Sequence, residues 1–518
     1  MASPITETAI STPAGELIGS ESETGLAFLG IPYAQPPIGP LRFRPPEPAP
    51  RWAGRRDAKA YGPSAPQNPD EPGIPYLPLD VGPTSEDCLY VNVWTPAADE
   101  RARPVLFWVH GGAFTAGAGS EPFYDGAALA AEQDVVVVTI NYRLGALGGF
   151  VYFNDLGDDR LAYSANVGLL DIALALQWVH DNIAAFGGDP DCVTLAGQSA
   201  GGKLVATILA LPAAAGLFHR AILQSPGSPN AFQPAEGHAL AEEFLRNLGS
   251  ADPAAVVGAS AEELWRAALP LSLMTMGPSG APIAPTLDGS VLPVQVLDAI
   301  AAGSADSVPL LVGSVTHELE LMLRGPGLDT AGAEVLTGLA QMFDEPLRQR
   351  ILEAYADDAL AESSPAAPYP VTALLSDRMV RLGSIRLLEA HATPQTFAYL
   401  LEWKTQVDSG ATHCIDLPLL FATTSVPDAP ALLGSGPDVA ILGRTVRDCW
   451  GAFMRTGDPS VAGTAAWPAY TVDRRATLLL GRDPAVIDDP WAPQRRAWDG
   501  IEDPGGPLPS FTATRGQP

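Results

Sequence analysis

The sequence predicts an α/β fold with a large, mostly parallel central sheet and helices on both faces. Three observations support this prediction. Short apolar runs recur along the chain, they alternate with stretches of helical periodicity, and a serine flanked by glycines lies where one run passes into a helical pattern. Strands that are buried on both faces of a parallel sheet appear as continuous hydrophobic runs, so this alternation favours a doubly wound sheet.

The predicted strands share a continuous apolar character, and several are rich in β-branched residues. They lie at residues 105–109, 135–140, 193–196, 221–223, 310–312 and 397–401. Helical spacing of apolar residues predicts helices over 168–186, 203–211 and 385–390. Proline is dense between residues 32 and 83, which predicts a long, irregular but ordered surface segment. Because no internal repeat or low-complexity linker interrupts the chain, we expect one domain over residues 1–518.

Composition and charge exclude several classes of function. Hydrophobic residues make up 47% of the 518 residues, which is ample for a large core. The 30 Lys and Arg against 59 Asp and Glu leave a net charge of −29, which argues against nucleic acid and against anionic membranes as partners. No apolar run reaches the roughly 18 residues that a membrane span requires. The first twenty residues contain Glu7 and Glu16 and no long apolar run, so no signal peptide is expected. A monomer is the default expectation.

The four cysteines are few and widely spaced. They are Cys88, Cys192, Cys414 and Cys449. None forms a C-x-x-C pair, so we expect neither a metal site nor a redox site, and no cofactor. Cys192 is expected to be a small apolar residue buried in a core strand. So few cysteines without an export signal fit a reducing cytoplasm.

The serine between two glycines is the most informative local feature. Ser199 has Gly197 two positions before it and Gly201 two positions after it, with an apolar strand pattern ahead and a helical pattern behind. This arrangement is typical of a nucleophile elbow, a turn too tight for side chains at the flanking positions. The elbow projects the hydroxyl outward and places a helix N-terminus beside it, where a developing oxyanion is favoured.

A serine nucleophile needs a base within hydrogen-bond reach, and in this kind of fold the histidine comes last along the chain. Of the seven histidines, only His391 and His413 lie late enough. His391 ends a predicted helix, where a histidine is expected to act as a C-terminal cation. His413 lies in a loop after the predicted strand 397–401, where a general base belongs. We therefore expect His413 to be the base.

The acid that orients the base is expected after a strand end between the serine and His413. The strand 310–312 leads to Glu318 and Glu320, and Asp288 is a weaker candidate in a turn. Spacing alone does not separate the two glutamates. His317, beside them, is expected to lie around the site or on the surface rather than to act as the base.

A loop of small residues follows the strand 105–109. It begins with His110 and continues through Gly111, Gly112 and Ala113 to Phe114. Small residues let backbone N–H groups approach a substrate carbonyl, as in the glycine-rich loops of esterases. This loop and the glycine-flanked Ser199 are two independent motifs, and they occur in the chain order that such a fold requires. An ordinary glycine turn is therefore a poor explanation for the loop.

Over nearly its whole length the chain resembles the type-B carboxylesterase and cholinesterase family. The matching motifs lie at residues 30–39, 41–43, 85–93, 141–145, 197–202, 450–459 and 467–468. The resemblance implies an α/β-hydrolase fold over residues 1–518. It also implies that Glu318 is the acid and His413 the base, that Ser225 lies close to both, and that Gly111 is a hinge. The oxyanion donors that it implies are the N–H groups of Gly112, Ala113 and Ala200.

Three positions depart from the family pattern. The residue before the nucleophile is commonly glutamate in the family, but here it is Gln198, which removes a negative charge near the imidazole. Ala65 stands where secreted members often have a cysteine partner for Cys88, so Cys88 is expected to be unpaired. Pro226 interrupts the usual stretch after Ser225 and weakens that assignment.

The resemblance implies a serine carboxylesterase that hydrolyses small-molecule esters through an acyl-enzyme. An amidase or carbamate hydrolase on the same residues is the alternative, and an inactive binding protein is a third possibility that the intact Ser199, Glu318 and His413 disfavour. The walls of the substrate pocket are expected to include residues of the segment 271–276. The individual candidates are Phe114, Met274, Met276 and Leu319.

Overall fold

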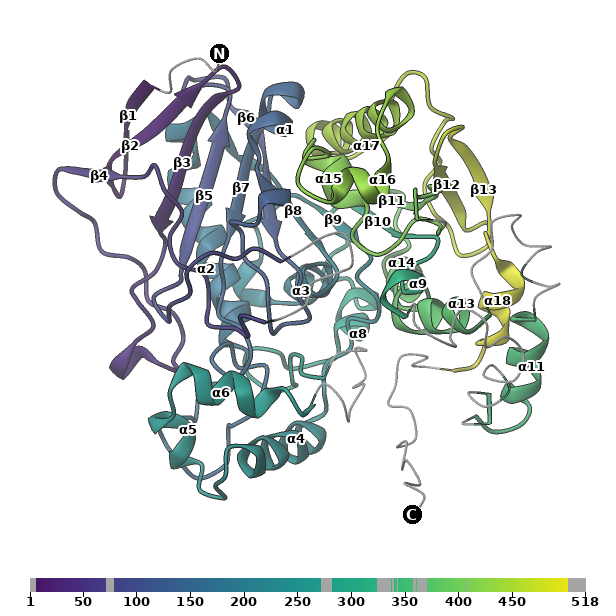
Figure 1. The fold of residues 1–518 in the computed structure, drawn as a ribbon, viewed down its shortest axis with the longest axis horizontal. Helices are drawn as coiled ribbons and strands as arrows, with labels where there is room; N and C mark the ends of the chain where they lie inside the picture. Colours follow the sequence, from purple (N-terminus) through teal and green to yellow (C-terminus); the bar gives the residue numbers. More distant parts are fainter. Residues whose placement is uncertain are drawn as a thin grey trace.

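The structure is a computed structural model that describes residues 6–70, 79–271, 282–323, 337, 340–341, 343–356, 360, 370–407 and 409–501. Its centre is one sheet of 13 strands (Figure 1). The strand order is β1-β2-β3-β5-β7-β6-β8-β9-β10-β11-β12-β13, and β4 pairs with β2 beside this path. Helices lie on both faces of the sheet, so the predicted α/β class is confirmed.

Seven neighbouring strands in the middle of the sheet run parallel to one another. In sheet order they are β7 (Val136–Ile140), β6 (Arg103–Val109), β8 (Gly188–Gln198), β9 (Arg220–Gln224), β10 (Leu310–Val315), β11 (Thr396–Leu401) and β12 (Ala476–Leu480). All six predicted strands are among them. β8 begins at Gly188 rather than at residue 193, and β12 was not predicted.

Antiparallel strands complete both edges of the sheet. They are β1 (Thr6–Thr12), β2 (Gly15–Ser22), β3 (Gly25–Pro32) and β5 (Tyr90–Thr95) on one side and β13 (Ala485–Asp488) on the other, with the short β4 (Arg55–Asp57) parallel to β2. Apart from β4 and a short 3₁₀ turn at Gly39–Leu41, the described part of the proline-dense segment after β3 is irregular, as predicted.

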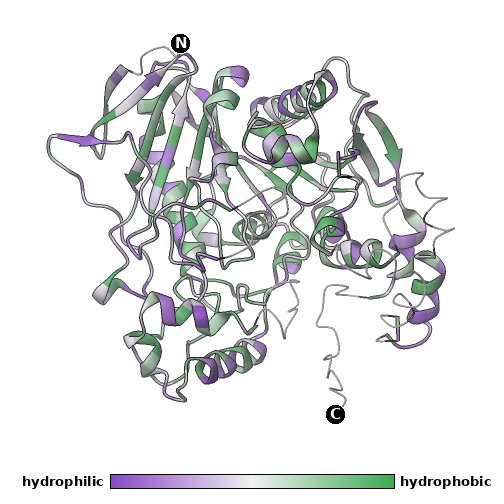
Figure 2. Ribbon diagram, in the orientation of Figure 1, coloured by the Kyte–Doolittle hydropathy of each residue, from purple (hydrophilic) through white to green (hydrophobic). Residues whose placement is uncertain are grey.

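Side chains alternate between the two faces of the sheet and form two hydrophobic cores. On β6, Val105 and Phe107 point to one core, whereas Leu106 and Trp108 point to the other. The helices of the first core include α2 (Val167–Asn182), α3 (Ala200–Leu209) and α8 (Val296–Ala301), and those of the second are α1 (Ala127–Gln133), α15 (Asp416–Leu420), α16 (Ala429–Leu433) and α17 (Pro437–Thr456). Figure 2 shows α3 largely hydrophobic and α4 largely hydrophilic.

Eight further α-helices are described, and several of them, including α4, α6 and α14, also contribute side chains to the first core. They are α4 (Pro234–Asn247), α5 (Ala254–Gly258), α6 (Ala261–Ala268), α9 (Glu320–Leu323), α11 (Leu347–Ala354), α13 (Pro370–Ser376), α14 (Leu382–His391) and α18 (Ala492–Ala497). The predicted helix over 168–186 is α2 with a 3₁₀ continuation, 203–211 corresponds to α3, and 385–390 lies within α14.

A buried ion pair ties the loop after β7 to α2. Arg143 donates to both carboxylate oxygens of Asp171, at 2.8 and 2.6 Å, and both side chains are almost fully buried. The same guanidinium donates to the backbone oxygen of Arg44, at 2.8 Å. Because two guanidinium nitrogens bind two carboxylate oxygens, the ion pair fixes the relative orientation of the two side chains as well as their separation. It therefore joins the proline-dense segment, the β7 loop and α2.

All four cysteines are free, so Cys88 is unpaired as expected. Cys192 corrects its prediction, because it is half-buried and makes polar contacts instead of packing as an apolar residue. Its sulfur accepts from Arg220 Nη1 at 3.2 Å and donates to the backbone oxygen of Met454 at 3.5 Å.

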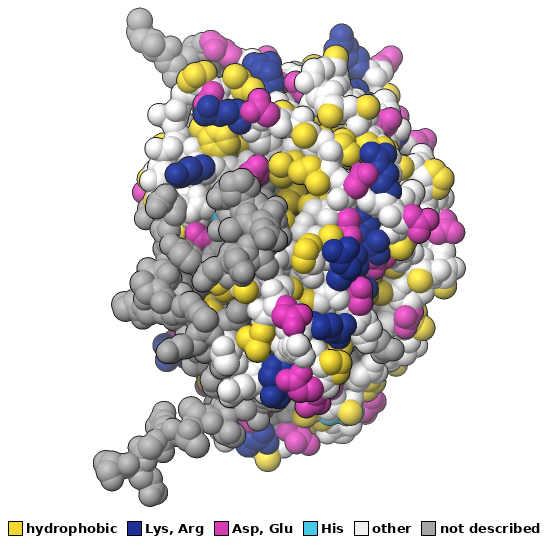
Figure 3. Space-filling model, turned by 90° about the vertical axis from the view of Figure 1, so that its right-hand side faces the viewer, with side chains coloured by type: hydrophobic (Ala, Val, Ile, Leu, Met, Phe, Trp, Pro, Cys, Tyr) yellow, Lys and Arg dark blue, Asp and Glu magenta, His cyan; other side chains and the backbone are white. Residues whose placement is uncertain are grey.

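Charges of both signs are interspersed on the face that carries α11, α18 and β13 (Figure 3). Several arginines there sit against carboxylates, among them Arg474 with Asp488 and Arg495 with Asp489, both at 2.8 Å. No helix within the described residues has the length and apolar character that crossing a bilayer requires.

Candidate active site

Ser199 lies at the corner between β8 and α3. Its backbone has φ 58° and ψ −126°, a region that non-glycine residues seldom occupy, and its N–H donates to Gln224 O at 2.9 Å. A Cβ on Gly201 would lie 2.1 Å from Val109 O, and one on Gly197 would lie 2.6 Å from the carbonyl carbon of Gly201. The corner therefore requires glycine on both sides, for the reason that the sequence suggested.

Ser199, His413 and Glu318, which we call the triad, form a continuous chain of hydrogen bonds. His413 Nε2 lies 2.8 Å from Ser199 Oγ, and His413 Nδ1 lies 2.5 Å from Glu318 Oε2. A carboxylate only accepts hydrogen bonds, so Nδ1 carries the proton and Nε2 is left as an acceptor. The hydroxyl of Ser199 then donates to Nε2, which is the arrangement that a general base requires.

Glu318 is held by two further donors on its other oxygen. Ser225 Oγ donates to Oε1 at 2.7 Å, and the backbone N–H of Val315 donates to Oε1 at 2.9 Å. The glutamate is 1% exposed. Ser225 therefore contacts the triad despite Pro226, because its own positive φ of 47° turns the hydroxyl toward Glu318.

The other predicted acids lie elsewhere. Glu320 opens α9, and its carboxylate is 3.7 Å from Nε2 of His317, while Nδ1 of His317 is 2.9 Å from Thr316 Oγ1. Asp288 accepts from Asn166 Nδ2 at 3.1 Å and from backbone N–H groups of residues 290–292, so it closes a turn. His317 is buried and lies between Thr316 and Glu320.

The expectation for His391 as a helix C-terminal cation is wrong. The residue does end α14, but its ring is buried between Thr396 Oγ1 at 2.6 Å and Ala305 O at 3.1 Å. Burial lowers the pKa of His391, which favours the uncharged imidazole. The helical pattern correctly predicted that His391 lies at the end of a helix. Its pKa, however, depends on how the neighbouring residues pack around it.

The loop after β6 presents backbone donors near the corner. Gly112 has φ 106°, and Ala113 has φ 52°. Their N–H groups donate no hydrogen bond to another described residue. Ala200 is the first residue of α3, where an N–H lacks a helical partner. A Cβ on Gly111 would lie 3.2 Å from the Cβ of Ser199, so this loop packs directly against the corner that carries Ser199.

His110, at the start of this loop, is not a competing base. Its Nδ1 lies 2.8 Å from Gly111 O, and its ring stacks on Tyr142 with centroids 4.4 Å apart. Burial lowers the pKa of His110 to about 4, so the ring is neutral and committed to its neighbours. Tyr142 donates its hydroxyl to His110 O at 2.9 Å, which pins the start of the loop.

Gln198 lies against His413, and Cys414 lies against Gln198. Gln198 Nε2 is 3.2 Å from His413 Nε2, and Cys414 Sγ donates to Gln198 Oε1 at 3.1 Å. Sequence reasoning named Gln198 but missed the thiol in this site. The available signal was that Cys414 directly follows His413.

Two further buried carboxyls were also missed: Asp416 lies close enough to Glu318 and His413 to interact with them electrostatically, and Glu121 interacts in the same way with Cys414. Burial raises the pKa of Asp416 to about 6, and its Oδ2 accepts from Gln224 Nε2 at 2.6 Å. Burial raises the pKa of Glu121 to about 8, and its Oε1 accepts from Ala118 N at 3.0 Å. Neither group is part of a recognisable motif, so only the fold brings them to the site.

The predicted pocket residues are only partly described. Phe114 is buried against Phe150, with ring centroids 5.0 Å apart, and Leu319 donates its N–H to Ser376 Oγ at 3.1 Å. Met274 and Met276 lie outside the described residues.

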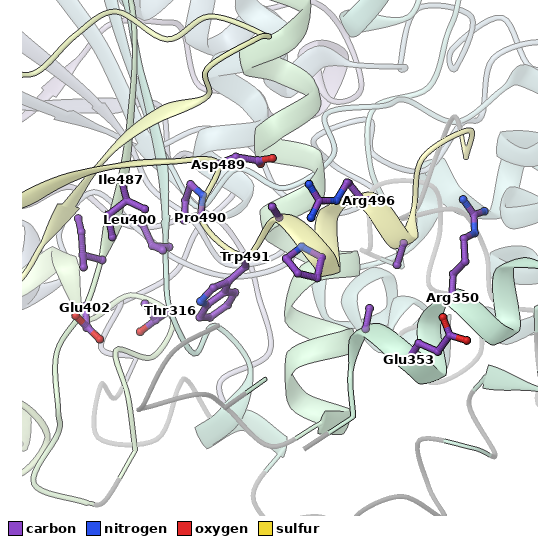
Figure 4. A pocket seen from close by; sticks show the side chains of 15 residues that line it. Thr316, Arg350, Glu353, Leu400, Glu402, Ile487, Asp489, Pro490, Trp491 and Arg496 are labelled. Carbon is purple, nitrogen blue, oxygen red and sulfur yellow. The ribbon is translucent and has the colours of Figure 1, made fainter. Parts of the chain in front are cut away.

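A large cavity of about 710 Å³ lies between α11, α18 and the ends of β11 and β12. Figure 4 shows the ring of Trp491 in its middle, with Arg350 and Arg496 on one side and Glu402 on the other. Among its described lining residues none belongs to the triad. Charged side chains of both signs line the cavity. In the described part of the chain, no group of three or more His, Cys, Asp or Glu side chains is placed to hold a metal ion.

Comparisons with known proteins match almost the whole chain. The model of the Carboxylesterase family matches residues 6–498. The para-nitrobenzyl esterase of Bacillus subtilis (strain 168) is 37% identical over 501 residues, covering 95% of this chain and 98% of that protein. The phenmedipham hydrolase of Pseudarthrobacter oxydans is 34% identical over 497 residues, covering 93% and 97%.

Solved structures agree with these relatives. The carboxylesterase of Geobacillus stearothermophilus superimposes with a TM-score of 0.82 at 38% identity, covering 95% of this chain and all of that chain. A PNB esterase structure gives the same TM-score at 34% identity. With its α/β-hydrolase fold and a family match along its length, this chain belongs to the carboxylesterase family and is a carboxylic ester hydrolase.

Proposed function

We propose that this enzyme hydrolyses carboxylic esters through a covalent acyl-enzyme on Ser199, with His413 as the base and Glu318 as the acid that orients it. The observation that carries the proposal is the unbroken pair of hydrogen bonds, 2.8 Å from Ser199 to His413 and 2.5 Å from His413 to Glu318. A base in contact with the hydroxyl and a carboxylate behind the base are the two requirements for activating a serine.

In the first half of the reaction, Ser199 Oγ attacks the ester carbonyl while Nε2 of His413 takes the hydroxyl proton. The imidazolium that forms is stabilised by the carboxylate of Glu318, which stays ionised. The carbonyl oxygen becomes an oxyanion and is bound by the N–H groups of Gly112, Ala113 and Ala200.

The tetrahedral intermediate then collapses. The bond between carbonyl carbon and alcohol oxygen breaks, and His413 gives its proton to the departing alcohol, which leaves the acyl group on Ser199. In the second half, His413 takes a proton from a water molecule that attacks the acyl carbon. Collapse of this second intermediate returns the proton to Ser199 Oγ and releases the carboxylic acid. The cycle needs no cofactor.

The substrate is the least determined part of the proposal. One relative is named for para-nitrobenzyl esters and another for phenmedipham. Amide or carbamate hydrolysis on the same triad stays the alternative. A panel of nitrophenyl esters of rising acyl length, para-nitrobenzyl esters, a nitrophenyl carbamate and phenmedipham ranks these classes by kcat/KM. We expect the esters to have the highest kcat/KM. A carbamate with a higher kcat/KM than every ester would instead favour carbamate hydrolysis as the main activity.

The catalytic role of Ser199 is tested by replacing it. Ser199→Ala removes the nucleophile, and loss of the nucleophile in such triads lowers kcat by about 10⁶-fold. An organophosphate should add to Ser199 in the wild-type enzyme, as identified by peptide mass spectrometry, and should leave the variant unlabelled. A few per cent of residual activity on a nitrophenyl ester in the variant, or a label on another residue, would show that the nucleophile is wrongly assigned.

Three expectations extend this proposal beyond the site. We infer one domain over residues 1–518, a monomer, and a cytoplasmic enzyme. A single thermal transition, light scattering during size-exclusion chromatography, and fractionation of the source cells test these three statements in turn.

A further inference from the structure

The amide of Gln198 lies between two side chains that contact its opposite ends. Its nitrogen is 3.2 Å from Nε2 of His413, and its oxygen accepts from the thiol of Cys414 at 3.1 Å. Gln198 is 1% exposed, and Cys414 is also buried. Cys414 has a φ of 68°, a conformation that non-glycine residues adopt at a cost and that is found where the surrounding structure enforces it.

The chemistry of the two contacts sets the direction of the amide. Since Nδ1 of His413 donates to Glu318, Nε2 accepts, and the amide nitrogen of Gln198 is a suitable donor for it. Burial raises the pKa of the Cys414 thiol well above its usual value, so the S–H stays protonated and donates to the amide oxygen. If the amide were reversed, two acceptors would meet at His413.

We propose that Cys414 is a positioning residue for ester hydrolysis: its thiol holds the amide of Gln198 with the nitrogen facing Nε2 of His413, and so favours the neutral form of the base. The inference rests on the proposed role of His413. In the neutral ring, Nε2 accepts from both Ser199 and Gln198. In the imidazolium, Nε2–H would face an amide N–H₂, so two donors would oppose each other.

The consequence is a base whose protonation the facing amide N–H₂ group opposes. It is also a stronger acid once it holds the serine proton, which helps it to protonate the departing alcohol. Four other titratable groups face this cluster, namely Glu318 from the β10 end, Asp416 from α15, and Glu121 and Tyr124 from the loop after β6. They are unchanged in the variants below, so the comparison isolates the amide.

Three variants test the proposal through the pH profile of kcat/KM. Cys414→Ala removes the donor, so the amide can turn and offer its oxygen to the imidazolium. We expect the acidic limb to move to higher pH by about half a unit to one unit, the effect of one hydrogen bond. Cys414→Ser keeps a donor and should return the limb toward that of the wild type. In a Gln198→Met background, which has no amide to turn, Cys414→Ala should leave the limb in place.

Titration of the imidazole by NMR keeps the test separate from catalysis. The spectrum of Ser199→Ala protein contains the signals of seven histidines. The signal that disappears when His413→Asn is added belongs to His413, so its titration can be followed directly. Cys414→Ala should move its midpoint upward there too, even if Ser199 proved not to be the nucleophile. The proposal is overturned if Cys414→Ala and Cys414→Ser have the same midpoint as the parent, or if the shift persists in the Gln198→Met background. A loss of kcat without movement of the limb would show a merely structural role and would also overturn it.

Discussion

Two glutamates only two positions apart have different surroundings because β10 ends just before them. Glu318 points to His413 and receives hydrogen bonds from Ser225 and Val315, whereas Glu320 opens α9 and lies near His317. The backbone turn after β10 points the two glutamate side chains in different directions. The role of a carboxylate at this site therefore follows from its donors and not from its distance along the chain.

Replacing each glutamate with glutamine separates the two roles. Glu318→Gln keeps the shape but loses the charge that stabilises the imidazolium, so we expect kcat to fall by about 10⁴-fold. Glu320→Gln does not alter the triad and should lower kcat far less. Steady-state kinetics on a nitrophenyl ester measures both. Equal losses, or a larger loss at Glu320, would contradict the assignment of Glu318.

We expect Glu121 to make the free energy of unfolding depend on pH. Burial raises its pKa from 4.5 to about 8, so between these values the folded chain holds a proton that the unfolded chain has released. The free energy of unfolding therefore falls as pH rises through this window. Glu121→Gln keeps an oxygen for the N–H of Ala118 but cannot ionise. We expect it to stabilise the protein at pH 8.5, by on the order of a few kcal/mol, and to change little at pH 5.

Thermal midpoints of the wild type and Glu121→Gln at pH 5 and pH 8.5 measure this difference. Glu100→Gln, at an exposed position, is the matched control and should show no such dependence. A constant difference between Glu121→Gln and the wild type at both pH values would exclude Glu121 as the source.

At the scale of elements, the nucleophile corner depends on how closely β8, α3 and the end of β6 approach one another. Gly201 lies under the carbonyl of Val109, and the space that a Cβ would need is already filled by backbone atoms. Backbone cannot move aside as a flexible side chain can. The strain at Ser199 is therefore enforced by the crossing of a helix and two strands.

Gly201→Ala should disrupt this corner. Its Cβ would lie 2.1 Å from Val109 O and 2.6 Å from His110 O, so α3 or the loop after β6 must shift. A displacement of about 1 Å between reacting groups costs about 10²-fold in rate, and we expect kcat/KM to fall at least that far. Gly258→Ala in α5, where a Cβ meets open space, is the control and should keep its activity. Unchanged kinetics in Gly201→Ala would refute the close-approach argument.

At the scale of the whole molecule, the pair between Arg143 and Asp171 joins three distant parts of the chain. Removing one partner of a buried pair leaves an uncompensated charge, which costs about 3–5 kcal/mol. We therefore expect Asp171→Ala to lower the thermal midpoint by about 3–5 °C in a chain of this length. Asp181→Ala, at an exposed position of the same helix, should change it little. If calorimetry gave the same midpoint for both variants, the ion pair between Arg143 and Asp171 would not stabilise the fold as argued.

The enzyme as a whole is expected to work without a metal ion, because in the proposed mechanism His413 activates Ser199 and backbone N–H groups bind the oxyanion. Prolonged dialysis against excess EDTA should leave kcat/KM on a nitrophenyl ester unchanged. Loss of activity that zinc restored would overturn the proposed mechanism.

The sequence by itself predicted the parallel sheet, the serine corner and the pairing of Ser199 with His413. Continuous apolar runs and the two glycines around Ser199 are local signals that report burial and tight turns directly. Chain order singled out His413, because its loop follows a strand late in the chain. β12 was not predicted, although it too is a short apolar run.

Only the tertiary structure decided which groups surround the base and how they are charged. Spacing left Glu318 and Glu320 open and the family resemblance favoured the first, but the contacts of each carboxylate follow from the turn after β10. The lowered pKa of His391, the bond from Cys414 to Gln198 and the raised pKa of Glu121 all depend on residues far away along the chain. Desolvation and hydrogen-bond partners are properties of the packed molecule, and no local pattern encodes them.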